Sequence, residues 1–277
     1  WAFPLNILFL NAYKFYLQKG KKIRIFDKEV VGNSKKISFY PPGISKKFKI
    51  NDNIKIDFDQ VIIKLIKKLN DGWIGKIINS GYIGQNKATN LDRNINLQSI
   101  TEKDKEAIKV ALKMGIKFFS FSFANTKEDV LKLRKLIGNK SFLISKIESK
   151  KGIINLKDII NCSDAILIDR GDLSREVAIE KIPIMQRKII KISTNLNKPV
   201  YVATNLLETM ITKNYPNRAE VNDVISSLEM GANGLVLAAE TAIGKYPIDA
   251  VRIINKLIFE FEKWKKEKFK KLSKIKI

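Results

Sequence analysis

From Thr101 onward, strand-like and helix-like segments alternate, and this alternation constrains the fold of the chain most strongly. Short apolar runs typical of buried strands cover residues 117–123, 141–148, 165–169, 199–203 and 234–239. Helix-like segments cover residues 101–114, 127–137, 182–196, 219–230 and 246–263, the first of them capped by Thr101 and Asp104. Largely apolar strands separated by helices predict a parallel sheet covered by helices. The strands lie about 25 to 35 residues apart, which fits an α/β fold of the (β/α)8 TIM-barrel type.

The segment before this alternation has a different pattern. Between residues 20 and 96, apolar and polar residues alternate with a period near two in the runs KKIRIF, KKISFY, NIKIDFD and GWIGKIIN. Turn signals such as Pro41-Pro42-Gly43 separate these runs, so we expect a small antiparallel all-β module. The apolar run NILFL at residues 6–10 is expected to form a buried strand rather than part of a membrane span, because polar residues interrupt the surrounding stretch.

Composition excludes several kinds of chemistry. The 277 residues include no histidine and one cysteine, Cys162, which excludes histidine-based triads, histidine zinc sites and internal disulfides in this chain. The lone cysteine fits a reducing cytoplasm. The net charge of +24 admits attraction of phosphorylated metabolites or nucleic acid. The lysines are spread over the whole chain, however, which favours a solvated surface.

Polar residues stand at the C-terminal ends of the expected strands, where the active sites of such barrels lie. They are Ser122, Lys146, Glu148, Arg170, Gly171, Asp172, Thr204, Asn205, Glu240 and Thr241. Lys146 and Glu148 share one face of their strand, because side chains alternate along a strand. In a dry barrel interior, a lysine and two carboxylates must neutralise one another or hold a cation. Two carboxylate ligands with open positions for water describe a Mg²⁺ site well.

A lysine beside a divalent cation is suited to phosphoryl transfer, whose transition state needs charge stabilisation more than covalent chemistry. The same groups would stabilise an enolate oxygen, which is also a developing anion. Gly171 would let substrate oxygens approach the backbone closely. The hydroxyl of Thr204 would lie on a proton path to carbon.

At these residues the sequence resembles the pyruvate kinase family. The matching stretches are ISKIESKKGI (144–153), SDAILIDRGDL (163–173), EKIPIMQ (180–186), NKPVYVATNLLETMI (197–211), PNRAEVNDV (216–224) and AAETAIGKYPIDAV (238–251). Their order and spacing follow the family. Before residue 97 the resemblance is looser, and KGKKIRI (19–25) and LQSITEKD (97–104) resemble the entry into and the return from the family's β-barrel lid.

The resemblance implies transfer of phosphate from phosphoenolpyruvate to ADP in glycolysis, with Mg²⁺ (or Mn²⁺) and usually K⁺. For catalysis it implies Lys146, on the transferred phosphoryl group, and Thr204. It further implies that the metal is bound by Glu148 and Asp172, that phosphoenolpyruvate is contacted by Lys146, Gly171, Asp172 and Thr204, and that the nucleotide lies near Arg24 and Lys87.

The resemblance also implies a domain organisation. Residues 1–19 are expected to hold one barrel strand, residues 20–97 the inserted all-β barrel lid, and residues 98–277 five further β/α units. The family's first two barrel strands and its C-terminal regulatory domain have no match, so we expect a divergent member truncated at its N-terminus. Leu17 stands where the family has an aspartate that helps to bind K⁺, which puts K⁺ dependence in doubt.

Other functions stay open at this point. One is a pyruvate-kinase-like protein that binds Mg²⁺ and a phosphometabolite without phosphorylating ADP. Another is a metal-dependent lyase or aldolase acting on pyruvate enolate, against which the inserted β module argues. A basic nucleic-acid binder is a distant alternative, because no nucleic-acid motif is present. We expect a cytoplasmic phosphotransferase without nucleic-acid or membrane partners, for which a homo-oligomer is compatible with the sequence.

Overall fold

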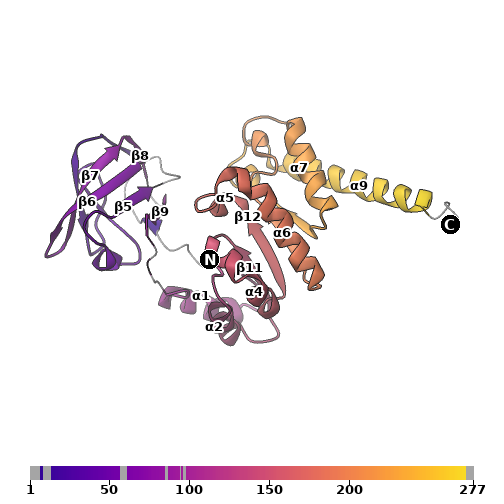
Figure 1. The fold of residues 1–277 in the computed structure, drawn as a ribbon, viewed down its shortest axis with the longest axis horizontal. Helices are drawn as coiled ribbons and strands as arrows, with labels where there is room; N and C mark the ends of the chain where they lie inside the picture. The colour runs from indigo at the N-terminus through magenta and orange to yellow at the C-terminus, as the bar shows by residue number, and fades with distance from the viewer. Residues whose placement is uncertain are drawn as a thin grey trace. The chain divides into compact units, whose positions relative to one another are not determined.

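The computed structural model describes residues 7–8, 14–56, 61–84, 87–93, 95 and 98–272, and it divides into two compact units (Figure 1). One unit spans Phe3–Gln98 and is built from strands. The other lies within Ser99–Ile277 and alternates strands with helices. The boundary between the units coincides with the change of sequence pattern near Thr101.

The β-rich unit contains a seven-stranded sheet in the order β1-β9-β5-β6-β7-β3-β4 and a separate pair, β2 with β8. The strands are Ile7–Leu8 (β1), Phe15–Leu17 (β2), Lys22–Phe26 (β3), Lys36–Ser38 (β4), Asn53–Ile56 (β5), Val61–Leu69 (β6), Gly72–Asn79 (β7), Gly81–Ile83 (β8) and Lys87–Leu91 (β9). Only β3 and β4 pair in parallel among the described strands of this unit. Ile23, Ile25 and Ile63 are buried at alternate positions, as the period-two pattern predicts.

Two residues of the expected N-terminal strand, Ile7 and Leu8, belong to the described part of the chain. Ile7–Leu8 pairs antiparallel with β9 of the β-rich sheet and not with the parallel sheet. The edge of β9 offers unpaired backbone groups that an extended segment can satisfy. The other residues of 6–10 lie outside the described residues. Leu17 is fully buried in the core of the β-rich unit, so it supplies an apolar contact and no oxygen ligand. The expected division at residues 19/20 and 97/98 stays a prediction.

The α/β unit is built on a five-stranded parallel sheet in the order β10-β11-β12-β13-β14. Its strands are Phe118–Phe121 (β10), Phe142–Ile147 (β11), Ala165–Asp169 (β12), Val200–Ala203 (β13) and Gly234–Val236 (β14). Its helices are Glu102–Lys113 (α1), Lys127–Ile137 (α2), Lys150–Ile154 (α3), Leu156–Cys162 (α4), Arg170–Leu173 (α5), Ile182–Asn195 (α6), Arg218–Glu229 (α7), Ala239–Ala242 (α8) and Pro247–Leu272 (α9). The expected alternation of strands and helices is therefore confirmed. Closure into an eight-stranded barrel stays a prediction.

Local sequence signals set several helix ends in this unit. Thr101 and Asp104 form the expected capping box at the start of α1, and Asn217 with Glu220 forms another at α7. At the end of α2, Gly138 follows with a φ of 76°, a conformation that suits a residue without a Cβ.

The sheet of the α/β unit has two unlike faces. Leu143 and Ile147 of β11 are buried in the core that the sheet forms with its helices, while α4 contacts β11 and α6 contacts β12 and β13. Side chains at the alternate positions point to the opposite face. Lys146 lies on that second face and is half-buried. The candidate site is built at the carboxyl end of this face.

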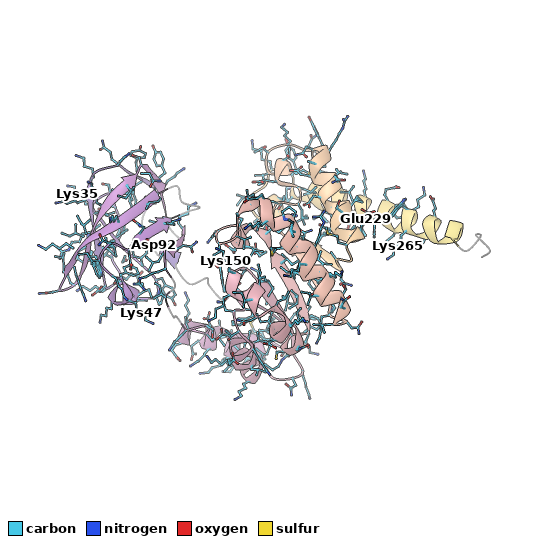
Figure 2. The ribbon with its side chains drawn as sticks, viewed as in Figure 1. Lys35, Lys47, Asp92, Lys150, Glu229 and Lys265 are labelled. Carbon is cyan, nitrogen blue, oxygen red and sulfur yellow. The ribbon has the colours of Figure 1, made fainter. Side chains whose placement is uncertain are left out.

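Exposed lysines are distributed over both units (Figure 2). Lys35 and Lys47 belong to the β-rich unit, and Lys150 and Lys265 belong to the α/β unit. This distribution supports the interpretation of the positive charge as a solvated surface. Among the described helices, none combines the length and the apolar character that crossing a membrane requires.

Candidate active site

Lys146 is the central cation of the site. Its Nζ lies 2.7 Å from Oε1 of Glu148 and 3.1 Å from Oδ2 of Asp169. Nζ also lies 3.5 Å from Oγ of Ser122, which follows β10. Burial would lower the pKa of the amine, but the charges of Glu148 and Asp169 outweigh it and raise the pKa above its usual value. The amine is therefore protonated at neutral pH.

Glu148 follows the last residue of β11 and is buried. The backbone N–H of Phe123 donates a hydrogen bond to its Oε2, whereas Oε1 is held by the ion pair to Lys146. Burial raises the pKa of Glu148 to about 7, the charges of Asp169 and Asp172 add to the rise, and Lys146 opposes it. This carboxylate would gain from a further cation, because its burial disfavours the charged form.

Asp169 and Asp172 complete an acidic cluster with Glu148. One carboxylate oxygen from each of the three residues lies within 4.8 Å of the others. Asp169 ends β12 and its Oδ1 accepts a hydrogen bond of 3.4 Å from the N–H of Asp172 in the short helix α5. Burial raises the pKa of Asp172, and Asp169 adds to the rise while Arg175 and Lys146 oppose it.

Asp169 is a site residue that the sequence reasoning missed, because it was treated as the last residue of a strand. Alternation of side chains fixes the strand face of Asp169, but the register with the neighbouring strand decides which residues it meets. Lys146 pairs in register with Leu167 on the neighbouring strand, so Leu167 and Asp169 lie on the face of Lys146. Extending that register by two residues places Asp169 beside Glu148.

Gly171 and Thr204 lie beside the acidic cluster. The N–H of Gly171 donates a 2.8 Å hydrogen bond to Oγ1 of Thr204, and that hydroxyl donates a 2.6 Å hydrogen bond to the carbonyl of Ala203. A Cβ added at Gly171 would meet Thr204 at 3.5 Å and Oδ1 of Asp169 at 3.6 Å, which are ordinary contacts. The protein itself therefore tolerates a side chain at Gly171, although the added atom would occupy space at the site.

Arg170 holds the loop that carries Thr204. Thr204 and Asn205 adopt positive φ values of 68° and 52°. Arg170 donates hydrogen bonds to the carbonyl of Thr204 from Nε, at 3.1 Å, and from Nη2. Its Nη1 pairs with Asp223 of α7. Arg170 thus connects the end of β13 to α7, and these contacts stabilise the fold around Thr204.

Glu240 also has a structural role in the contacts it makes. It is buried, and its two carboxylate oxygens accept hydrogen bonds from the N–H groups of Leu207 (3.0 Å) and Ala238 (2.8 Å). These bonds fasten the loop after β13 to the start of α8. Both oxygens therefore satisfy backbone donors of the fold.

The two residues expected near the nucleotide belong to the β-rich unit. Arg24 lies on β3, where its Nη2 contacts both carboxylate oxygens of Asp71 at 2.7 and 2.9 Å and half of its side chain is exposed. Lys87 begins β9. The structure thus brings together Lys146, Glu148 and Asp172, with Gly171 and Thr204 next to them, and the nucleotide role of Arg24 and Lys87 stays a prediction.

The acidic cluster fits a hard divalent cation. Its donors are all carboxylate oxygens, the group that Mg²⁺ and Mn²⁺ prefer. Glu148 is buried and carries a raised pKa, so it lacks enough positive charge in the protein to offset its burial. Glu148 and Asp172, the expected ligands, are both members of the cluster, and Asp169 is a third oxygen donor.

Comparison with known proteins identifies the family. The model of the pyruvate kinase barrel domain matches residues 8–251. The chain belongs to the pyruvate kinase family. The pyruvate kinase of Thermotoga maritima is 37% identical to it over 89% of this chain and 54% of that protein. The pyruvate kinase of Clostridium acetobutylicum is 35% identical over 91% of this chain and 54% of that protein. The pyruvate kinase of Thermococcus litoralis is 32% identical over 90% of this chain and 53% of that protein. The chain spans about half the length of these pyruvate kinases.

The raised pKa of Glu148 predicts how stability depends on pH. The pKa is about 7 in the folded protein and 4.5 without the fold, so the folded state binds the extra proton between these values. The contribution of Glu148 to the free energy of unfolding is thus most favourable below its pKa of 4.5 in the unfolded chain and declines as the pH rises toward its pKa of about 7 in the folded protein. Glutamine cannot ionise, so Glu148→Gln avoids this decline. We expect the free energy of unfolding of Glu148→Gln, minus that of the unsubstituted chain, to be larger at about pH 8 than at about pH 5 by about 1–3 kcal/mol.

Urea unfolding in metal-free buffer at both pH values would measure this difference. Glu229→Gln on α7 is the matched control, because Glu229 is exposed (Figure 2). Its effect on stability should be the same at both pH values. A pH-independent effect of Glu148→Gln would contradict a raised pKa at this site.

Proposed function

We propose that this chain transfers the phosphoryl group of phosphoenolpyruvate to ADP, giving pyruvate and ATP, with Mg²⁺ or Mn²⁺ bound by Glu148 and Asp172. One observation carries the proposal: a lysine stands among three carboxylates at the carboxyl end of a parallel sheet, in a member of the pyruvate kinase family. A barrel of the (β/α)8 type, with active sites at that end of its strands, is part of the same proposal.

The side chains present suit a substrate with a phosphate and a carboxylate. The amine of Lys146 would donate to an oxygen of the transferred phosphoryl group and stabilise the charge that develops there. Glu148 and Asp169 take two of its three N–H donors, and the third, on an Nζ that lies 3.5 Å from Oγ of Ser122, would make this contact. When bound, the divalent cation would supply further charge neutralisation at the phosphate and at the enolate oxygen.

In this proposal the hydroxyl of Thr204, supported by Gly171, would lie on the path of the proton to the enolate carbon. The bond from the enol oxygen to phosphorus breaks, that phosphorus bonds to a terminal oxygen of ADP, and the methylene carbon then takes a proton to give pyruvate. The hydroxyl of Thr204 now donates to the carbonyl of Ala203. Rotation of that hydroxyl would direct its hydrogen toward the substrate, while the N–H of Gly171 supports its oxygen.

The proposal is tested by pyruvate formation. Purified chain, phosphoenolpyruvate, ADP and Mg²⁺ should yield pyruvate, measured by coupled oxidation of NADH, and chelation of the metal should stop it. If no pyruvate forms, a thermal shift with phosphoenolpyruvate and Mg²⁺ decides between two outcomes. A rise in melting temperature would leave a binding protein that does not phosphorylate ADP, and no rise would reject the substrate as well.

A further inference from the structure

Arg175 places a second cation directly on the acidic cluster. Its Nη2 lies 2.9 Å from Oδ1 of Asp172. The side chains of Arg175 and Asp172 are 16% and 22% exposed, whereas those of Arg252 and Asp249, a pair with the same spacing on α9, are 70% and 44% exposed. Burial strengthens the electrostatic interaction, so the Arg175 pair should hold far more tightly than the surface pair.

The backbone favours this contact. The N–H of Arg175 donates a 3.1 Å hydrogen bond to the carbonyl of Asp172, which continues the turn of α5. Side chains three residues apart on such a turn lie on the same side. The guanidinium is therefore directed to Asp172 by the local chain.

The charges of the cluster show what this contact does. Three carboxylates gather here, and Lys146 pairs with two of them, Glu148 and Asp169. Arg175 pairs with the third. Each carboxylate thus has a protein cation within ion-pair distance. A divalent cation that binds Asp172, at either carboxylate oxygen, lies close to the guanidinium on Oδ1 and is repelled by its charge in a poorly screened place.

We infer that Arg175 competes electrostatically with the divalent cation at Asp172 and thereby weakens metal binding. The inference rests on the metal site of the proposed function but not on turnover. Arginine keeps its charge at all physiological pH values, so the competition is not removed by titration. Arg175 acts through Asp172 and is thus a positioning residue.

Direct metal binding tests this inference. Free Mn²⁺ would be measured by electron paramagnetic resonance during titration of the unsubstituted chain, Arg175→Gln, Arg175→Met and Arg175→Lys. The first two substitutions remove the charge at similar side-chain length, and lysine retains it. We expect the two neutral variants to bind Mn²⁺ about tenfold more tightly, equivalent to about 1.4 kcal/mol. Arg175→Lys should stay within about threefold of the unsubstituted chain, because the charge is kept.

Arg252→Gln is the matched control, since it removes an arginine with the same spacing to an aspartate far from the cluster along the chain. It should leave Mn²⁺ affinity unchanged. In chelator, the neutral variants at Arg175 should melt at a lower temperature than the unsubstituted chain, and saturating Mn²⁺ should raise their melting temperature by more.

Unchanged or weaker Mn²⁺ binding in both neutral variants would overturn the inference, as would absence of binding in every variant. The inference would also be overturned if Arg175→Lys bound Mn²⁺ as tightly as the two neutral variants, because loss of the charge would then not explain the tighter binding. If no pyruvate forms but the neutral variants bind Mn²⁺ more tightly, the proposed function is rejected. The role of Arg175 at the metal site would still hold.

Discussion

Replacement of Lys146 by methionine should abolish turnover, with a loss of at least about a thousandfold in kcat, or about 4 kcal/mol of transition-state stabilisation. Methionine resembles the lysine stem in shape but carries no charge, so the phosphoryl group would lose the protonated donor that contacts Glu148 and Asp169 in the structure. The measurement is the rate of pyruvate formation at saturating phosphoenolpyruvate, ADP and Mg²⁺.

The structure adds a stability effect to this substitution. Without Lys146, the carboxylates of Glu148 and Asp169 lose their ion-pair partner, and breaking a buried pair on one side costs about 3–5 kcal/mol. We therefore expect Lys146→Met to melt at a lower temperature in chelator and to recover part of the loss in Mg²⁺, which would neutralise the cluster.

Lys150→Met is the matched control for this prediction. Lys150 begins α3, four residues further along the chain, and its side chain is exposed (Figure 2). It should retain turnover and stability. Full activity in Lys146→Met would remove the proposed mechanism, whatever the stability of that variant.

Replacement of Asp169 by asparagine should weaken Mn²⁺ binding by at least about tenfold, because a charged oxygen donor of the cluster becomes neutral. Asparagine keeps the size of the side chain and an oxygen for the N–H of Asp172, so the turn into α5 should survive. Mn²⁺ titration followed by electron paramagnetic resonance measures the affinity, and circular dichroism checks the fold.

Asp164→Asn supplies the control for a merely structural effect. Asp164 also sits in an ion pair of the α/β unit, with Oδ2 2.6 Å from Nη2 of Arg134, and it accepts a 2.7 Å hydrogen bond from the N–H of Leu143. Its replacement should lower stability without changing Mn²⁺ affinity. Equal affinities for Asp169→Asn and the unsubstituted chain would exclude Asp169 from the metal site.

The sequence alone determined the local features of this protein. Alternating strands and helices after Thr101, the capping box at Thr101, and the shared strand face of Lys146 and Glu148 all follow from periodicities and contacts within a few residues. The period-two pattern likewise predicted the buried isoleucines of the β-rich unit. Such features need no knowledge of which segments become neighbours.

Which charges of the site meet depends on the pairing of strands that are far apart in the sequence. The register of β11 with β12 brings Asp169 to Lys146. From the sequence, Glu240 was one of several polar residues expected at strand ends. In the structure its carboxylate accepts hydrogen bonds from the backbone N–H groups of Leu207 and Ala238. The pairing of Ile7–Leu8 with β9 was equally hidden. The physical reason is that electrostatic and hydrogen-bond partners are chosen by distances across neighbouring strands and turns, which a linear pattern does not contain.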